Sequence, residues 1–304
     1  VQQVVGSGIG GLQDGDFRAA RFSQPQGMAW DGQTQTLHVA DTGNHAIRAV
    51  DFAQVQVQTI AGNGTQSRAI FPHGGLGKTL SLNSPWDLVR VGQRLYIAMA
   101  GMHQIWVMDL ETQRLETDIG TGAEGCVDGD RTVAAFAQPS GLATDGAHLY
   151  VADSETSSIR RVTLGRHPSV TTLCGSGALF DYGDRDAVGD AVRLQHPMGV
   201  AVISPGDPTD RPPTPLENTP LVYIADTYNH KLKQLSPTGA CATLVSALHR
   251  PAGVASSQHG LYIADTHAHR VMVSPGPIAG QQAVASQPNV LHFKLEPLLI
   301  NGLP

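Results

Sequence analysis

One stretch of sequence decides the fold of this 304-residue chain: Ala40-Asp41-Thr42-Gly43-Asn44-His45-Ala46-Ile47-Arg48, which returns as Ala225-Asp226-Thr227-Tyr228-Asn229-His230-Lys231-Leu232-Lys233. Each copy follows a run of β-branched and aromatic residues that suits a strand. Weaker copies occur at residues 98–106, 152–160 and 264–272. Self-similarity at a fixed spacing is the signature of a repeat architecture. We therefore expect five copies of one structural unit.

A proline marks the start of each copy, about every 55 residues along the chain. The five are Pro25, Pro85, Pro139, Pro197 and Pro251. Each precedes a short apolar segment, a second strand that ends at the Asp-containing motif, and a third and a fourth strand. Gly-x-Gly turns close the fourth strand at Gly62, Gly120 and Gly175. Four short strands per unit predict an all-β fold of β-propeller blades. A β-sandwich is the runner-up, but it would not require the motif to return five times at one phase.

The spacing predicts the following boundaries. Residues 1–8 are an outer strand of a preceding or closing blade, and the blades are 9–64, 65–122, 123–177, 178–246 and 247–295, with 296–304 as a tail or the start of a following domain. The Pro-rich stretch 204–220 is read as an exposed insertion in the fourth blade. Two closures stay open. Either residues 1–6 complete the last blade in a ring of five, or residues 290–295 do and the N-terminal strand is the remnant of a sixth blade.

Composition excludes several classes of function. The net charge of −6 and the pI near 6.1 give no basic surface for nucleic acid. We find no apolar run long enough to cross a membrane, so we expect a soluble chain and no membrane insertion. The first residue is Val1 rather than Met, from which we expect a longer parent protein and infer nothing about compartment. Cys126, Cys174 and Cys241 form no metal-spaced cluster and leave the redox state open.

The motif resembles the NHL repeat. Further segments, among them Ser84-Pro85-Trp86-Asp87 and Leu194-Gln195-His196-Pro197-Met198-Gly199-Val200, resemble the propeller of the thioredoxin-like/NHL proteins over roughly residues 6–273. The resemblance implies a thioredoxin-like domain before the propeller, a small β-rich domain after it, and six blades in the complete parent. The thioredoxin-like part and its C-x-x-C chemistry are absent from this sequence.

Asp and His residues of the motif could suggest a metal or acid/base site. A zinc or catalytic site needs three or four groups that converge on one point, whereas these residues recur once per blade. We interpret them as structural, with the Asp accepting backbone N–H groups of its own turn and the His bracing it. The predicted structural residues are Asp41, His45, Arg48, His103, Asp153, Arg160, Asp226, His230, Lys233, Asp265 and His269.

Acidic loops lead into three of the blades, and they contain Asp14, Asp16, Asp128, Asp130, Asp184 and Asp186. None has the full spacing of a calcium loop, and Asp-Gly is a common turn dipeptide. In a propeller these loops share a face with the Asp/His turns. We therefore expect this acidic face to be the surface for a protein partner, with the thioredoxin-like domain of the parent as a neighbour.

Two functions compete at this point. The first is a non-catalytic scaffold for protein interaction, with no catalytic residue, metal or cofactor. The second is a propeller enzyme similar to lactonases or lyases, with a central metal or ligand site. The inner strands favour the first, because Asp31 and Asp87 are the only acids near them. Fold alone cannot decide between the two.

Overall fold

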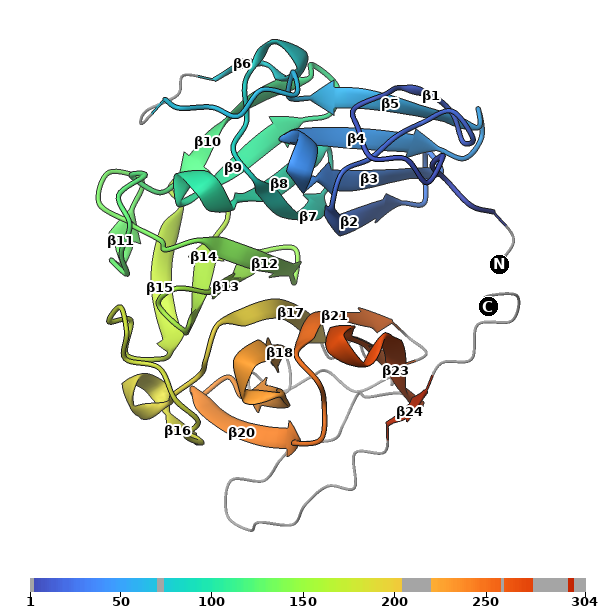
Figure 1. Ribbon diagram of the computed structural model, residues 1–304. Helices are drawn as coiled ribbons and strands as arrows, with labels where there is room; N and C mark the ends of the chain where they lie inside the picture. Colours follow the sequence, from blue (N-terminus) through green and yellow to red (C-terminus); the bar gives the residue numbers. More distant parts are fainter. Residues whose placement is uncertain (1–2, 70–73, 204–219, 258–259, 276–294, 298–304) are drawn as a thin grey trace, which may run out of the picture. The chain divides into compact units, whose positions relative to one another are not determined.

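The computed structural model describes residues 3–69, 74–203, 220–257, 260–275 and 295–297. It is a β-propeller with five blades, each an antiparallel sheet whose main strands lie in chain order (Figure 1). The prediction of an all-β propeller is confirmed. The predicted insertion at 204–220 and the segment 276–294 lie outside the described residues, apart from Pro220.

The chain divides into two compact units, of which the first ends at Leu142 and the second begins at Ala143. In the first unit, blade 1 contains β1 (Gly15–Asp16), β2 (Pro25–Asp31), β3 (Thr36–Asp41), β4 (Ala46–Asp51) and β5 (Gln56–Ala61). Blade 2 contains β6 (Gly75–Leu76), β7 (Pro85–Val91), β8 (Arg94–Met99), β9 (Gln104–Asp109) and β10 (Arg114–Ile119). Blade 3 spans the boundary between the units, with β11 (Gly129–Asp130), β12 (Pro139–Thr144), β13 (His148–Asp153), β14 (Ser158–Thr163) and β15 (Ser169–Cys174).

In the second unit, blade 4 contains β16 (Ala187–Val188), β17 (Pro197–Ile203), β18 (Leu221–Asp226), β19 (Lys231–Leu235) and β20 (Ala240–Val245). Blade 5 contains β21 (Pro251–Ser257), β22 (Gly260–Asp265), β23 (Arg270–Pro275) and β24 (Glu296–Pro297). Short 3-10 turns follow the second or the outermost strand: η1 (Thr42–Asn44), η2 (Gly77–Thr79), η3 (Ala100–Met102), η4 (Gly189–Ala191), η5 (Thr227–Asn229) and η6 (Thr266–Ala268).

Each of the five marker prolines is the first residue of an inner strand. This is the position in a sheet where the missing N–H of proline costs least. The residue before each proline has a positive φ: Gln24, Ser84, Gln138, His196 and Arg250. The chain therefore turns sharply into every blade at the same place.

A short fifth strand at the outer edge is the main departure from the predicted four. In blade 1, β1 pairs with β5 through Gly15–Val57 and Asp16–Gln56, and β6 and β16 pair with β10 and β20 in the same way. Each of these strands covers the unpaired edge of an outer strand, which would otherwise be open to pairing with another chain.

The two ends of the described chain differ from the expected strands. Residues 3–8 form no strand; the N–H groups of Gly6 and Ser7 donate to Phe17 and Ala20 instead. In blade 5, β24 pairs with β23 at Met272–Pro297 and Val273–Glu296. A segment just after the predicted 290–295 thus supplies the outer strand of this blade.

Candidate partner-binding face

In four of the five blades, the motif Asp forms a buried connection inside its blade. In blade 1 the Asp41 carboxylate is fully buried; its Oδ1 accepts the N–H of Ser23, and its Oδ2 accepts the amide of Asn44 and the guanidinium of Arg48, at 2.7 to 2.8 Å. Blade 4 repeats this with Asp226, which accepts from the N–H of Gln195 and the amide of Asn229. The motif Asp thus fixes the loop that leads into its own blade, and it accepts the side-chain amide of the Asn in its own turn rather than the backbone N–H groups that we expected there. The turn η1 is closed by backbone, since the N–H of His45 bonds Thr42.

A buried cation completes the connection. Arg48 is fully buried and also donates to the carbonyl groups of Gln13 and Arg21 and to Asp14, at 2.7 to 2.9 Å. The ladder between β4 and β5 shifts register at Ile47/Arg48, and equivalent shifts occur at Ile159/Arg160 and Leu232/Lys233. Irregularities of this kind re-aim a side chain, and here each coincides with the basic residue. The structural role that we infer for Arg48, Arg160 and Lys233 therefore depends on the register shift at each of these positions.

Blade 2 makes the connection without an Asp, and in blade 5 Asp265 also accepts the N–H of His249 in the entry loop but the cation comes from another position. In blade 2, Met99 and Trp106 replace the Asp and the Arg, and Trp106 donates to Gln104, which in turn donates to the carbonyl of Gly120. In blade 5, Asp265 pairs with Arg270 at 2.8 Å. In blade 3, Asp153 pairs with Arg160 at 3.0 Å, and both are fully buried.

The motif His joins neighbouring blades. Nδ1 of His45 accepts the N–H of Ser84 at 3.0 Å, Nδ1 of His103 accepts that of Gln138, and Nδ1 of His230 accepts that of Arg250. In blade 3 the hydroxyl of Ser157 takes the same place and accepts the N–H of His196. We had expected the His to brace its own Asp. Because each His adopts a left-handed conformation, its ring points to the next blade instead.

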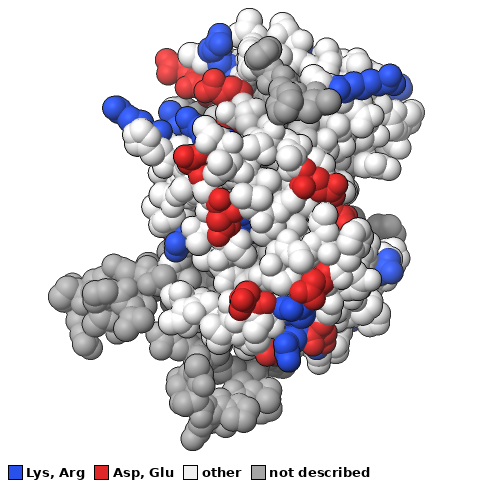
Figure 2. All heavy atoms as spheres, turned by 90° about the vertical axis from the view of Figure 1, so that its left-hand side faces the viewer, with Lys and Arg blue, Asp and Glu red and all other residues white. Residues whose placement is uncertain are grey.

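The acidic loop residues are largely occupied within the blades. Asp14 accepts from Arg48 and Thr59, and Asp186 accepts from Lys233 and Thr243. Asp184 pairs with Lys231 and Lys233. Although burial opposes the charged form, hydrogen bonds to Asp184 and Asp186 raise the pKa of the Lys233 ammonium. Space-filling atoms show acidic side chains in small separate groups, some next to basic ones (Figure 2).

Two of the acids serve their own turns. Oδ1 of Asp16 accepts the N–H groups of Arg18 and Ala19 at 2.8 Å, and these bonds lower the pKa of Asp16. Asp130 accepts from Thr132 in the same manner. These Asp-Gly segments are therefore turn residues, as the dipeptide suggested.

An exposed row of aromatic rings lies in blade 4, on the same face as the acidic loop. The ring of His196 lies 4.8 Å from that of Tyr228 and 6.2 Å from that of Tyr182, and the guanidinium of Arg250 lies 5.0 Å above the ring of Tyr228. We call these four residues, with Phe180, the aromatic row. Phe180, Tyr182 and Tyr228 are 86%, 51% and 41% exposed.

Backbone contacts hold the aromatic row in place. The N–H of Tyr228 donates to Gln195, the N–H of Gly183 donates to Leu194, and the amide of Asn229 donates to Gly183. Nε2 of His196 lies 3.4 Å from Glu155. Sequence reasoning missed this row. Its signal was the presence of Tyr228 where the first copy has Gly43, together with two aromatic residues in one acidic loop of a chain that is only 5% aromatic.

The two inner-strand acids have separate partners. Asp87 accepts the N–H groups of Leu88 and Leu142 at 2.8 Å, and burial raises its pKa to about 7. Asp31 pairs with Arg90 at 3.2 Å and lines a hollow of about 360 Å³ with His38. Across the described ranges, no group of three or more His, Cys, Asp or Glu side chains is arranged to hold a metal ion.

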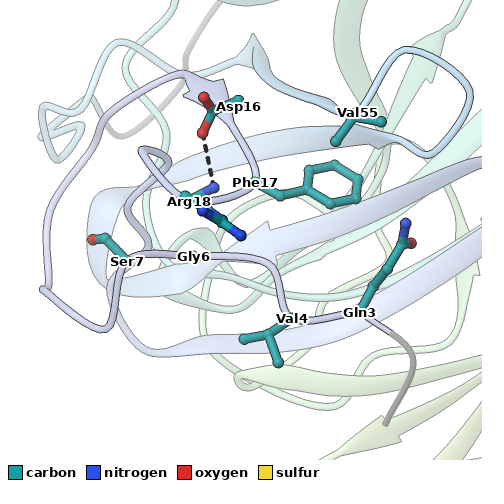
Figure 3. Close-up of a pocket in the computed structure, with 8 residues that line it drawn as sticks. All are labelled: Gln3, Val4, Gly6, Ser7, Asp16, Phe17, Arg18 and Val55. Carbon is teal, nitrogen blue, oxygen red and sulfur yellow. Dashed lines mark hydrogen bonds between the residues drawn. The ribbon is translucent and has the colours of Figure 1, made fainter.

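A hollow of about 730 Å³ lies beside the N-terminal segment of blade 1 (Figure 3). Phe17 and Val55 line it together with Asp16 and Arg18, and the carboxylate of Asp16 is hydrogen-bonded to the backbone of Arg18. That carboxylate is committed to its turn, and Asp16 is the only acid among the described residues that line the hollow. In the part of the chain that the structure describes, no helix is long and apolar enough to cross a membrane.

Curated proteins show similarity over most of the chain. It is 39% identical to SUPPRESSOR OF QUENCHING 1, chloroplastic, of Arabidopsis thaliana, over 88% of this chain and 26% of that protein. It is 37% and 34% identical to NHL repeat-containing protein 2 of Bos taurus and Homo sapiens, over 90% of this chain and 42% of each relative. The chain thus spans less than half the length of these relatives. No model of a protein family matches it.

Solved structures share the fold at low sequence identity. The Nidogen/Laminin complex aligns with a TM-score of 0.56 and 16% identity, over 84% of this chain and 78% of that one. An auxiliary nutrient binding protein from Bacteroides thetaiotaomicron aligns with a TM-score of 0.53 and 15% identity, over 88% of this chain and 74% of that one. At such identities the alignments show the fold alone.

Proposed function

We propose that this chain, an NHL-type β-propeller similar to part of NHL repeat-containing protein 2 and of SUPPRESSOR OF QUENCHING 1, is a non-catalytic scaffold that binds a protein partner through the aromatic row of blade 4. The observation that carries the proposal is the exposure of Tyr182 and Tyr228, whose rings both lie near that of His196, with Arg250 over the ring of Tyr228. Tyr and Arg dominate the energetic centres of protein interfaces.

The surroundings of the row support a protein partner. The acidic loop that carries Phe180 and Tyr182 also carries Asp181, which pairs with Arg193 at 2.8 Å. Charged side chains therefore border the exposed rings, an arrangement typical of the polar rim of an interface. Because the ion pairs fix the loop, few of its side chains must be ordered on binding, which reduces the entropic cost of association.

A domain of the same parent protein is the partner we favour. The relatives extend well beyond the segment that matches this chain, and the resemblance implies a thioredoxin-like domain before the propeller. The acidic face that we expected from the sequence and the aromatic row are formed by the same loops in blade 4. A covalently linked domain would have a high effective concentration at this face.

Titration calorimetry of the propeller with the separately produced thioredoxin-like domain tests the proposal. We expect Tyr182→Ala with Tyr228→Ala to weaken binding at least tenfold, because loss of a central aromatic residue commonly costs more than about 2 kcal/mol. Trp30→Ala is the matched control, since Trp30 is also exposed but lies in blade 1. Equal binding by the double variant and the wild type would contradict the proposal, as would loss of binding in the Trp30 variant alone.

A further inference from the structure

Two buried thiols meet in the core of the second unit. Cys174 is the last residue of β15 in blade 3, and Cys241 is the second residue of β20 in blade 4. Both belong to one apolar cluster, with Val192 and Leu194, and their exposed fractions are 0% and 3%. The interaction with Cys174 raises the pKa of the Cys241 thiol, so the two thiols lie close enough to interact. Two cysteines from different blades thus lie together in one buried cluster.

The backbone around both thiols is held independently of them. The N–H of Gly175 donates to the carbonyl of Gly189 at 3.1 Å, and the N–H of Gly189 donates to that of Gly239 at 3.0 Å. A Cβ atom at Gly239 would lie 3.4 Å from the carbonyl oxygen of Leu173. The residues next to each cysteine therefore approach closely, and the thiols do not have to be brought together by a large movement.

We infer that Cys174 and Cys241 are a redox-active dithiol that forms a disulfide between blades 3 and 4. The oxidant is a disulfide, either a small molecule such as oxidised glutathione or a protein disulfide. The thiolate of one cysteine attacks it and releases the first thiol. The thiolate of the other cysteine then attacks the mixed disulfide and releases the second. Two cysteine thiols are oxidised, and the oxidant takes up two electrons and two protons.

The short strand β16 controls access to the pair. Ala187 pairs with Cys241, so β16 covers the outer edge of β20 at the thiol. Asp186, the residue before β16, is held by the ammonium of Lys233 and by the backbone and hydroxyl of Thr243. The hydrogen bond to Cys174, and burial, raise the pKa of the Cys241 thiol. Since the thiolate is the nucleophile, oxidation follows local opening of β16 and is slow in the closed state.

The disulfide has a definite structural consequence. Residues 175–186 form the loop that carries Phe180 and Tyr182; it begins directly after Cys174 and ends directly before β16, which pairs with Cys241. A disulfide between the two cysteines fixes both ends of this loop. The inference does not depend on the binding role of the aromatic row, because the bond and the rigidity of the loop are measured without a partner.

The experiment equilibrates the protein with reduced and oxidised glutathione at several ratios, traps free thiols with a maleimide in denaturant, and identifies disulfide-linked peptides by mass spectrometry. We expect one 174–241 linked peptide, with both thiols lost at the same ratio, and unchanged behaviour in Cys126→Ser. Limited proteolysis should show slower cleavage within 175–186 after oxidation.

A second variant keeps the test independent of cysteine substitutions that could disturb the core. Asp186→Ala removes the bonds that hold β16, so we expect faster oxidation of the same pair, with Asp130→Ala in blade 3 as the matched control of unchanged rate. Three results would overturn the inference. They are a disulfide between Cys126 and either Cys174 or Cys241, mixed glutathione disulfides alone, and a pair that stays reduced at every ratio in both the wild type and the Asp186 variant.

Discussion

Nδ1 of His45 accepts the backbone N–H of Ser84 at 3.0 Å, and so joins the turn of blade 1 to the residue that precedes β7 of blade 2, across 39 residues of sequence. The bond requires an unprotonated Nδ1. Burial lowers the pKa of His45, which is the direction expected if the neutral ring is the form that the folded chain binds. The same backbone contact recurs with His103 and His230 at the following junctions.

Acid should weaken the junction between blades 1 and 2. Because the pKa of His45 is lower in the folded than in the unfolded chain, the unfolded chain binds a proton first as pH falls below about 6.5. Stability is therefore complete above that pH and is lost as pH falls toward the folded pKa. His45→Ser should be stable but less sensitive to acid, since Ser157 makes the same contact in blade 3. Urea unfolding of both proteins above and below this pH measures the difference, and an equal slope with pH would contradict the assignment.

Loss of the Asp41 carboxylate should destabilise the chain strongly. Asp41→Ala leaves the fully buried Arg48 without its buried partner, which typically costs about 3–5 kcal/mol. The double change Asp41→Ala with Arg48→Met should recover much of this, because no uncompensated charge remains, and blade 2 shows that Met99 and Trp106 can fill the same positions. Denaturant titration measures the free energies of unfolding. A double variant no more stable than the single one would contradict this account.

Asp14, the more exposed of the two acids that contact Arg48, allows a comparison with Asp41. Asp14 pairs with Arg48 at 2.9 Å, but its side chain is 47% exposed. A half-exposed ion pair contributes about 0–1 kcal/mol, so Asp14→Asn should lower the unfolding free energy much less than Asp41→Ala. Equal losses in the two variants, measured under the same conditions, would show that burial does not set the strength of these pairs.

The carboxyl of Asp87 should oppose stability as pH rises. Burial raises its pKa to about 7 in the folded chain, whereas an unfolded Asp titrates near about 4. Between these values the folded chain holds the extra proton, so stability falls with rising pH and levels off above about 7. In Asp87→Asn this decrease should be absent. The difference in unfolding free energy between variant and wild type, measured across this range, should grow with pH; a constant difference would contradict the raised pKa.

Much of the fold was predictable because it is repeated. The prolines at residues 25 and 197 each begin an inner strand as expected, and Gly62 follows the fourth strand with a φ of 85° and a Cβ position only 2.3 Å from the carbonyl oxygen of His45. Where every copy has the same steric requirement, the same residue type recurs at the same position of the repeat and can be recognised in the sequence. The edge strand Gly15–Asp16 left none, because two residues are too few for any periodicity.

The candidate site was less predictable, because its contacts link distant residues. The sequence placed Asp41 and His45 in a structural turn, but the partner of His45 is Ser84 in the next blade. Tyr182 and Tyr228 come together through the ring of His196 between them, and no local spacing indicates that meeting. Exposure of an aromatic residue is likewise set by packing, so the row became visible only in the folded chain.

Hydrogen–deuterium exchange of the propeller, alone and with the thioredoxin-like domain added, tests the central claim most directly. The account predicts slower exchange of backbone amides in residues 178–186 and 227–230 on binding, and unchanged exchange around Trp30. Protection confined to other blades, or none when the domain is in excess of its dissociation constant, would contradict a partner site on the aromatic row of blade 4.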